Sequence, residues 1–203
     1  MSLENKLGIS NEMNLAREEE KISKTKAVKM FEEHFLDQLT PGTFDTLSKI
    51  HQYLFEDIYP FAGKVRHENL AKGYFRFAPA MYLEASLQNI EKMPQKTFNE
   101  IIEKYIEMNI AHPFREGNGR STRIWLNHLL KNELNLVIDW SKADKDDYLL
   151  AMERSPIQEI EIKVILKNAL TDKINDREVY RKGIDASYNY EGYHVFKSED
   201  LAQ

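Results

Sequence analysis

A segment of twelve residues near the middle of the chain concentrates side chains that could bind and attack a phosphate. It has the sequence HPFREGNGRSTR and spans residues 112–123. His112 could accept a proton near neutral pH, Glu116 is a hard oxygen ligand suited to Mg²⁺, and Phe114 would anchor the segment in the core. Three Arg minus one Glu give the segment a charge of +2, in a chain whose formal net charge is −5. This contrast indicates an anionic ligand.

The backbone of this segment could also bind an anion. Gly117-Asn118-Gly119 can adopt conformations closed to bulkier residues, so that successive N–H groups point into one concavity. The apolar pattern that follows predicts a helix beginning here, which adds the positive end of its dipole. Arg120 and Arg123 are three residues apart, so we expect them on one helix face, where they reach neighbouring phosphate groups.

The segment resembles the signature of the Fic family, H-x-F-x-[DE]-G-N-G-R-x-x-R, at every specified position. The resemblance implies transfer of AMP from ATP to a protein hydroxyl. His112 would deprotonate the hydroxyl that attacks the α-phosphate, and Glu116 would hold Mg²⁺ between the α- and β-phosphates. Asn118, the turn and Arg120 would bind the α/β region, and Arg123 the γ-phosphate.

A second motif lies near the C-terminus, where SYNYEG occupies residues 187–192. It resembles the inhibitory motif of Fic proteins, [ST]-x-x-x-E-[GN], in the single-domain class that carries it on a C-terminal helix. Ser187 and Glu191 are four residues apart and share a helix face. The resemblance implies that Glu191 pairs with Arg123 in the space of the γ-phosphate, so that ATP binds in an unproductive pose.

Two further roles are hypotheses about this end of the chain. Some Fic proteins with this glutamate also remove AMP, and Glu191 could orient the water for that hydrolysis. Tyr188 and Tyr190 lie beside it in the sequence, and either could be a site of self-modification that displaces the helix.

A β-hairpin is predicted between residues 65 and 78, where aromatic and polar residues alternate beside a glycine. The resemblance implies that this hairpin is a flap that holds the target segment by strand-to-strand hydrogen bonds. The residues expected to dock the target are Gly73, Tyr74, Phe75, Arg76 and Phe77. Arg76 could face the target or a phosphate, and the sequence leaves both open.

Apolar residues recur at helical spacing through the rest of the chain, which predicts an all-α fold: a Fic-type helical bundle with one short hairpin flap. The expected helices cover residues 24–38, 43–58, 81–93, 97 onward, 155–170 and 175–192. Capping boxes are expected at Thr97 and Ser155. The helix over 155–170 is apolar around most of its circumference, so we expect it to be central.

The chain is expected to form one Fic domain over residues 1–203. Within it, residues 175–192 are expected to form the inhibitory helix and residues 193–203 a tail. At 203 residues and 42% hydrophobic content, the chain is long enough for one sizeable core.

Composition excludes several classes of site. The chain has no cysteine, so disulfides, thiolate zinc sites and cysteine nucleophiles are excluded. The Walker and H-E-x-x-H patterns are absent. The N-terminus lacks an apolar stretch and no segment approaches a membrane span, so we expect a cytoplasmic protein without membrane contact. The acidic charge does not favour direct nucleic-acid binding.

Three functions are compatible with these residues. The first is AMP transfer, with ATP as co-substrate, Mg²⁺ as cofactor and an unidentified protein as target. The second is transfer of UMP, phosphocholine or phosphate by the same scaffold. The third is a silent binding module of a toxin–antitoxin pair, against which the intact His112 and Glu116 argue. Some bacterial Fic enzymes modify DNA topoisomerases, and members of this class can form homo-oligomers, but no residue identifies either partner here.

The remaining histidines are expected to be structural or solvated, because a lone histidine outside a motif usually has no chemical role. They are His34, His51, His67, His128 and His194.

Overall fold

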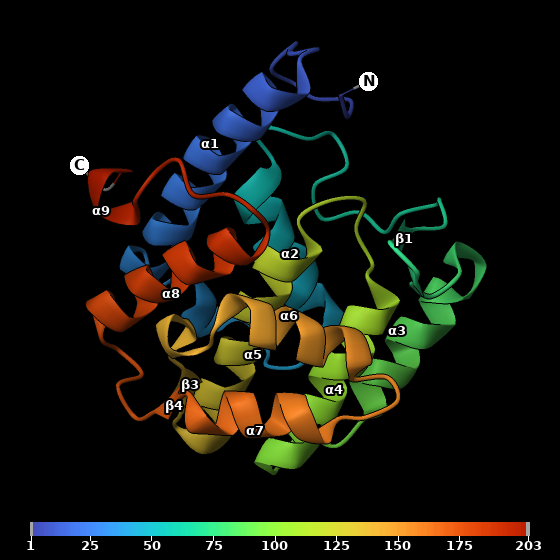
Figure 1. The fold of residues 1–203 in the computed structure, drawn as a ribbon, viewed down its shortest axis with the longest axis vertical. Helices are drawn as coiled ribbons and strands as arrows, with labels where there is room; N and C mark the ends of the chain where they lie inside the picture. Colours follow the sequence, from blue (N-terminus) through green and yellow to red (C-terminus); the bar gives the residue numbers. More distant parts are fainter. Residues whose placement is uncertain (1, 202–203) are drawn as a thin grey trace.

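The computed structural model describes residues 2–201, and most of them are helical (Figure 1). The α-helices are α1 (Glu12–Glu32), α2 (Phe44–Phe55), α3 (Leu83–Lys92), α4 (Phe98–Ala111), α5 (Asn118–Leu134), α6 (Lys145–Arg154), α7 (Ile160–Asn168), α8 (Arg177–Tyr190) and α9 (Ser198–Leu201). Short 3-10 helices cover Phe35–Gln38, Ala80–Tyr82 and Trp140–Lys142. The strands are β1 (Ala71–Lys72), β2 (Phe75–Arg76), β3 (Val137–Ile138) and β4 (Leu170–Thr171). The predicted all-α fold with a hairpin is confirmed.

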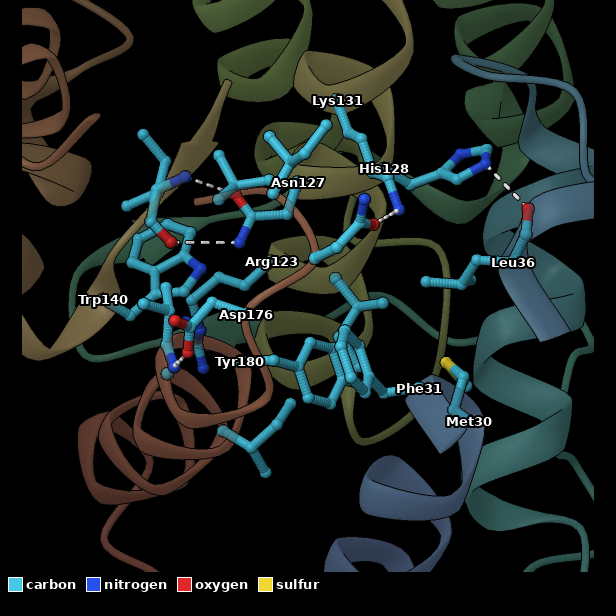
Figure 2. A pocket seen from close by; sticks show the side chains of 18 of the residues that line it. Met30, Phe31, Leu36, Arg123, Asn127, His128, Lys131, Trp140, Asp176 and Tyr180 are labelled. Carbon is cyan, nitrogen blue, oxygen red and sulfur yellow. Dashed lines mark hydrogen bonds between the residues drawn. The ribbon is translucent and has the colours of Figure 1, made fainter. Parts of the chain in front are cut away.

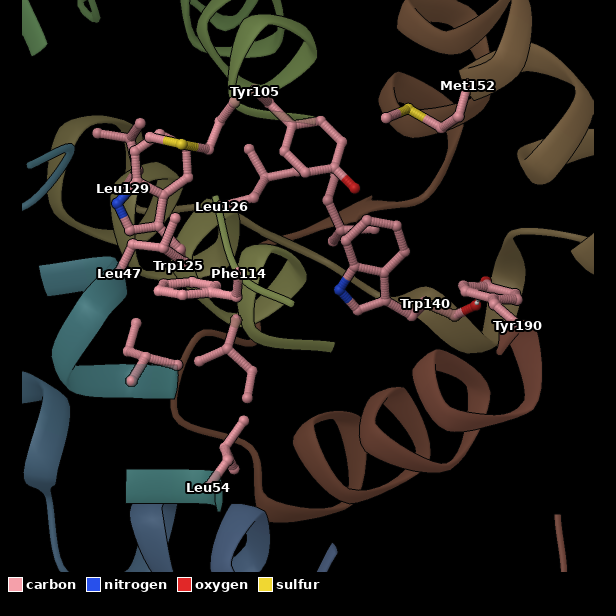
Figure 3. Close-up of a cluster of buried hydrophobic side chains, with 14 of the residues drawn as sticks. Leu47, Leu54, Tyr105, Phe114, Trp125, Leu126, Leu129, Trp140, Met152 and Tyr190 are labelled. Carbon is pink, nitrogen blue, oxygen red and sulfur yellow. Dashed lines mark hydrogen bonds between the residues drawn. The ribbon is translucent and has the colours of Figure 1, made fainter. Parts of the chain in front are cut away.

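Helix α5 is the centre of the packing. It contacts α2, α4 and α8, and α1 packs beside both α2 and α8 (Figure 1). Trp125, Leu126 and Leu129 of α5 are fully buried, as their apolar character predicts, and lie in the core with Leu47 of α2 and Tyr105 of α4 (Figure 3). The helix that follows the phosphate-binding turn is therefore held on several sides, which fixes the position of the turn.

Several predicted helix ends agree with the structure. Thr43 caps α2 by accepting a hydrogen bond from Thr46 N. Thr97 and Glu100 form the predicted capping box of α4. The last long helix is capped by Asp176, whose side chain accepts from Val179 N, and it ends at Tyr190.

The predicted helix over 24–38 is wrong at both ends. Helix α1 begins after Asn11, whose side chain accepts a hydrogen bond from Asn14 N, and it ends at Glu32. His34 then adopts a left-handed conformation with φ 54°, which separates α1 from the short 3-10 helix. The first turns of α1 are mostly charged and give no apolar periodicity, although Glu19 and Glu20 are buried.

The predicted helix over 155–170 is also wrong in its start and its position. Ser155 ends α6, and its hydroxyl donates to Met152 O instead of capping a helix. Helix α7 begins only at Ile160 and is peripheral, because Ile160 and Val164 are 65% and 52% exposed. Apolar residues around a whole helix therefore do not imply burial here.

A second two-stranded antiparallel sheet was not predicted. It pairs Val137 with Thr171 and Ile138 with Leu170. Strands of two residues are too short to show a period of two in the sequence. The predicted hairpin is present, with Ala71 opposite Arg76 and Lys72 opposite Phe75.

The predicted tail contains the short helix α9, while residues 202 and 203 lie outside the described residues. Among residues 2–201, none of the helices is both long and apolar enough to span a membrane.

Candidate active site

The turn before α5 depends on a glycine. Gly117 has φ 79°, a left-handed conformation that favours glycine, and a Cβ there would lie 2.5 Å from Cε2 of Phe55. Helix α5 begins at the next residue, so its first N–H groups face outward without partners inside the helix. The positive end of α5 therefore opens at this turn, as the sequence indicates.

The side chain of Asn118 faces away from that opening. Its Oδ1 accepts from Phe114 N at 2.8 Å and its Nδ2 donates to Phe114 O at 2.7 Å. The residue is 5% exposed. Asn118 thus fixes the segment between α4 and α5, and its side chain is not free to bind a phosphate in this conformation.

A buried histidine of α2 supports the same segment. His51 of α2 is fully buried and stacks on Phe114, with ring centroids 3.8 Å apart. Gly63 N donates to its Nδ1, so the neutral ring carries its proton on Nε2, which lies 2.7 Å from Glu116 O. No local pattern indicates that this histidine holds the backbone of Glu116, because the two are 65 residues apart.

His112 ends α4 in a left-handed conformation, with φ 48°. Its ring stacks on Phe77 of the hairpin at 3.6 Å between centroids. Burial lowers the pKa of His112 to about 4, with the nearby Glu191 carboxylate opposing and the Arg66 guanidinium adding to this effect. The imidazole is therefore neutral at neutral pH and able to accept a proton.

These two histidines make the fold sensitive to acid. Burial lowers the pKa of His51 to about 3 and that of His112 to about 4, whereas both titrate near 6.5 in an unfolded chain. Between these values the unfolded state binds more protons, so stability is complete above pH 6.5 and falls as the pH drops toward 3. We expect the urea midpoint to decrease over this range. His51→Gln should flatten the decrease, and an unchanged slope in that variant would contradict the assignment.

Arg120 does not share the space of Arg123, contrary to the expectation from their spacing. Arg120 is 1% exposed and turns toward α1, where its Nη2 lies 2.5 Å from Glu19 Oε1. The same nitrogen lies 3.2 Å from Oε1 of Glu116. The guanidinium also lies over the ring of Tyr193, 4.4 Å from its centroid. The buried carboxylate of Glu19 draws Arg120 inward, which the sequence pattern could not indicate.

Glu116 lies at the open side of the turn. Its side chain is 40% exposed, and Oε1 accepts hydrogen bonds from Gly117 N at 2.9 Å and Arg120 Nη2 at 3.2 Å. One accessible carboxylate beside an anion-binding turn fits Mg²⁺ that arrives with phosphate ligands, because this ion commonly takes one or two protein carboxylates. Among the described residues, no group of three or more acidic or histidine side chains forms a metal site without such phosphates.

Arg123 and the end of α8 are joined by three hydrogen bonds. Arg123 Nη2 donates to Glu191 Oε1 at 2.9 Å and to Ser187 O at 2.9 Å, and its Nε donates to Ser187 Oγ at 2.7 Å. Burial alone would raise the pKa of Glu191, but Arg123 outweighs it and lowers that pKa to about 2. A Cβ on Gly119 would overlap Glu191 Oε1. A carboxylate therefore occupies the positive end of α5.

Comparison with known proteins places this geometry in a family. A model of the Fic/DOC family matches residues 41–130. The probable protein adenylyltransferase y4lH of Sinorhizobium fredii is 30% identical over 140 residues, which cover 62% of this chain and 72% of that protein. The chain belongs to the Fic/DOC family. The sequence resemblance is thereby confirmed.

Other relatives agree with this membership. Protein adenylyltransferase VbhT of Bartonella schoenbuchensis is 28% identical over 181 residues, or 76% of this chain. The chain spans only 37% of the length of VbhT. The fold is similar to that of BepC from Bartonella tribocorum, crystallised with AMPPNP, with a TM-score of 0.70, 24% identity and coverage of 84% of this chain and 93% of that one.

The hairpin of this Fic chain lies beside His112. Tyr74 at its tip is fully exposed, and Gly73 adopts φ 59° in the turn. Arg76 is also exposed, whereas Phe77 covers the His112 ring. Phe75 packs on Phe77 with ring centroids 4.9 Å apart. The two aromatic residues thus support the hairpin, while Tyr74 and Arg76 are available to a partner.

One hairpin residue reaches the end of α8. Lys72 Nζ lies 3.7 Å from Glu191 Oε2. Lys72 lies within the predicted hairpin but was not expected to have a role, because nothing in the spacing brings it to a residue 119 positions later.

The structure does not support Tyr188 or Tyr190 as a modification site in this conformation. Tyr188 is fully buried and its hydroxyl donates to Ser23 Oγ at 2.8 Å. Tyr190 is 4% exposed and its hydroxyl donates to Trp140 O at 2.8 Å and Ala143 O at 2.7 Å. Both hydroxyls hold α8 in place.

A cavity of about 510 Å³ is lined by residues of α8, α1 and α5. Its wall includes Arg123 and Ser187, and Figure 2 shows Arg123, Trp140 and Tyr180 around it. Gly183 of α8 also faces it. The cavity therefore borders the inner face of α8 directly before Ser187, which accepts from Arg123.

Gly183→Ala is expected to stabilise the protein. Gly183 has no positive φ, and an added Cβ would lie 3.5 Å from Cδ1 of Trp140, an ordinary contact. Alanine in a helix interior is favoured over glycine by roughly 0.5–1 kcal/mol, which raises the Tm of a chain of this length by about 1–4 °C. Gly192→Ala is the control, because Gly192 has φ 84° and the same change should destabilise. Equal Tm shifts in the two variants would contradict this explanation.

Proposed function

We propose that this chain is a protein adenylyltransferase, which transfers AMP from ATP to a hydroxyl side chain of a target protein. The observation that carries the proposal is the convergence of His112, the positive end of α5 and Arg123 around one carboxylate, that of Glu191. A site that holds a carboxylate with a buried arginine and a helix N-terminus is suited to phosphate groups. The names of the relatives VbhT and y4lH and the AMPPNP bound to BepC support the same activity.

His112 would act as the general base. Its neutral imidazole would take the proton of the target hydroxyl, whose oxygen then forms a bond to the α-phosphorus of ATP. The bond between the α-phosphorus and the oxygen that bridges to the β-phosphate breaks, and pyrophosphate leaves. The ring is held in place by Phe77, so the base is oriented before the target arrives.

The phosphates would be bound by the first N–H groups of α5 and by Arg123. Glu116 would hold Mg²⁺, which neutralises phosphate charge when bound. Arg120 would act through Glu116, because it contacts that carboxylate and is buried against Glu19. Tyr74 and Arg76 are placed to meet the target segment, with strand pairing along the hairpin.

Glu191 would inhibit this reaction. Its carboxylate pairs with the guanidinium that would otherwise bind the γ-phosphate, and it occupies the space above Gly119. The domain would therefore be held inactive by its own last long helix, α8, until Glu191 leaves Arg123.

The decisive experiment supplies ATP labelled on either the α- or the γ-phosphate to the Glu191→Gly variant in a cell lysate. We expect protein labelling from α-labelled ATP alone, with competition by unlabelled ATP and not by UTP or CDP-choline. Labelling from the γ-phosphate above that of the lysate without this protein would assign phosphate transfer instead. Competition by UTP or CDP-choline would assign UMP or phosphocholine transfer. No labelling from any donor would overturn the enzyme assignment.

A further inference from the structure

Arg66 is a buried arginine that the sequence analysis did not single out. It lies in the loop between α2 and β1 and is 3% exposed. A buried cation is unfavourable unless hydrogen bonds replace its water, and burial lowers the pKa of Arg66 accordingly. The partners of this guanidinium therefore indicate why the fold retains it.

The guanidinium donates hydrogen bonds to four backbone carbonyls. Nε donates to His112 O at 2.7 Å, and Nη2 donates to Ala111 O at 3.0 Å and Ala78 O at 2.7 Å. Nη1 donates to Glu68 O at 2.5 Å. One planar group thus connects the C-terminal end of α4 to both sides of the hairpin base.

The backbone of the same loop makes a further connection. Arg66 N donates to Pro113 O at 2.9 Å, and Ala78 N donates to Ile110 O at 2.9 Å. The loop before the hairpin and the strand after it are therefore both bonded to the end of α4. The two acceptors, Ile110 and Pro113, lie on either side of His112 in the sequence.

His112 requires such support because of its conformation. Its left-handed backbone, with φ 48°, is disfavoured for a residue with a Cβ. The carbonyls of Ala111 and His112 lie at the negative end of α4, where a cation is favoured. Rotation of His112 back to a helical conformation would turn its carbonyl away from Arg66 Nε and its ring away from Phe77.

We propose that Arg66 is a positioning residue, which holds His112 in its left-handed conformation and fixes the imidazole against the hairpin. The inference rests on the proposed function for its catalytic consequence, because the imidazole is the base of that reaction. The guanidinium of Arg66 donates to backbone carbonyls at the end of α4 and at the hairpin base, and it acts through His112.

Arg66→Lys tests this assignment because lysine keeps the charge but lacks the planar fork of five donors. In the Glu191→Gly background, we expect kcat for AMP transfer to fall at least tenfold. The Kd for ATP, measured by calorimetry, should change less than twofold, because the phosphate-binding turn lies on α5. Arg154→Lys is the matched control, since Arg154 is exposed and pairs with Glu161 on the surface, and its kcat should be unchanged.

A second measurement does not depend on activity. The imidazole of His112 is titrated by NMR in protein that retains Glu191, so that the charges facing the ring, on Glu191, Lys72 and residue 66, keep their signs. In Arg66→Lys the pKa of His112 should rise toward 6.5, because a ring released from its position is less buried. An unchanged pKa together with an unchanged kcat would overturn the positioning role. Absent AMP transfer in the parent, with the pKa shift present, would overturn only the proposed function.

The unsubstituted protein provides the test if Arg66→Lys does not fold. The Nε–H of Arg66 donates to His112 O inside the protein, so its exchange with solvent should be at least a hundredfold slower than that of Arg154. A scalar coupling across this hydrogen bond to the carbonyl carbon of His112 should be detectable. Fast exchange of the Arg66 Nε–H and no coupling would overturn the proposal.

Discussion

Glu191→Gly is expected to raise the rate of AMP transfer about a hundredfold at saturating ATP and Mg²⁺. A hundredfold change corresponds to roughly 2.7 kcal/mol. A hydrogen bond between charged groups contributes about 1.5–3 kcal/mol, so the single bond from Arg123 to Glu191 is sufficient. The low pKa of Glu191, about 2, means that the carboxylate stays charged and paired at any pH at which the enzyme would be assayed.

Graded variants separate charge from shape in this prediction. Glu191→Gln keeps the side-chain length and can still accept a hydrogen bond from Arg123, but it loses the charge. Its rate should therefore lie between those of the unsubstituted protein and Glu191→Gly. Glu199→Gly is the control, because Glu199 is an exposed glutamate of α9 and its removal should leave the rate unchanged. Equal rates for the unsubstituted protein and Glu191→Gly would contradict the inhibitory role.

The sequence predicted the elements whose ends are marked by local side-chain bonds. Thr43 and Thr97 are N-caps with their partners three residues away, so the pattern and the structure agree. Ser155 carries an equally good capping pattern but binds Met152 O at the end of α6. Whether such a residue caps a helix depends here on how α6 and α7 pack on the core, and a local sequence pattern carries no information about that packing.

The site shows the same division between local and distant contacts. The two hydrogen bonds between Phe114 and Asn118 join residues four positions apart, and the motif indicated that this segment forms a turn. The positions of Arg120 and His51 depend on Glu19 and on residue 116, which lie 101 and 65 positions away in the sequence. Their roles depend on how the helices pack, which no local pattern contains.

These distant contacts also explain why the two arginines of the motif differ. Arg120 is neutralised by Glu19 inside the protein and borders Tyr193 of the tail, whereas Arg123 meets a carboxylate that is 24% exposed. Removing Glu191 would leave Arg123 without its acidic partner but Arg120 still paired. This difference supports the proposal that Arg123 binds an exchangeable anion and that Arg120 has a supporting role.

His112→Ala is expected to lower AMP transfer by roughly 10²–10⁴ in the Glu191→Gly background, because a positioned general base contributes about that factor. Binding of ATP should be retained, since the phosphate-binding groups lie on α5 and Glu116. The Kd for ATP by calorimetry and the initial rate with labelled ATP measure the two effects separately. In the protein that retains Glu191, kcat/KM should fall only as the pH approaches 4, because burial lowers the pKa of His112 to about 4 and the base must be neutral to act.

His194→Ala is the matched control for that variant, because His194 is exposed and remote in sequence from the motif. Its rate should equal that of the Glu191→Gly parent. If His112→Ala also retained the parent rate, the hydroxyl would be deprotonated by another group, and the buried imidazole would serve only to pack Phe77 against α4. A loss of ATP binding equal to the loss of rate would instead assign His112 to nucleotide binding. Only a lower rate with unchanged ATP affinity supports the role of His112 as the general base.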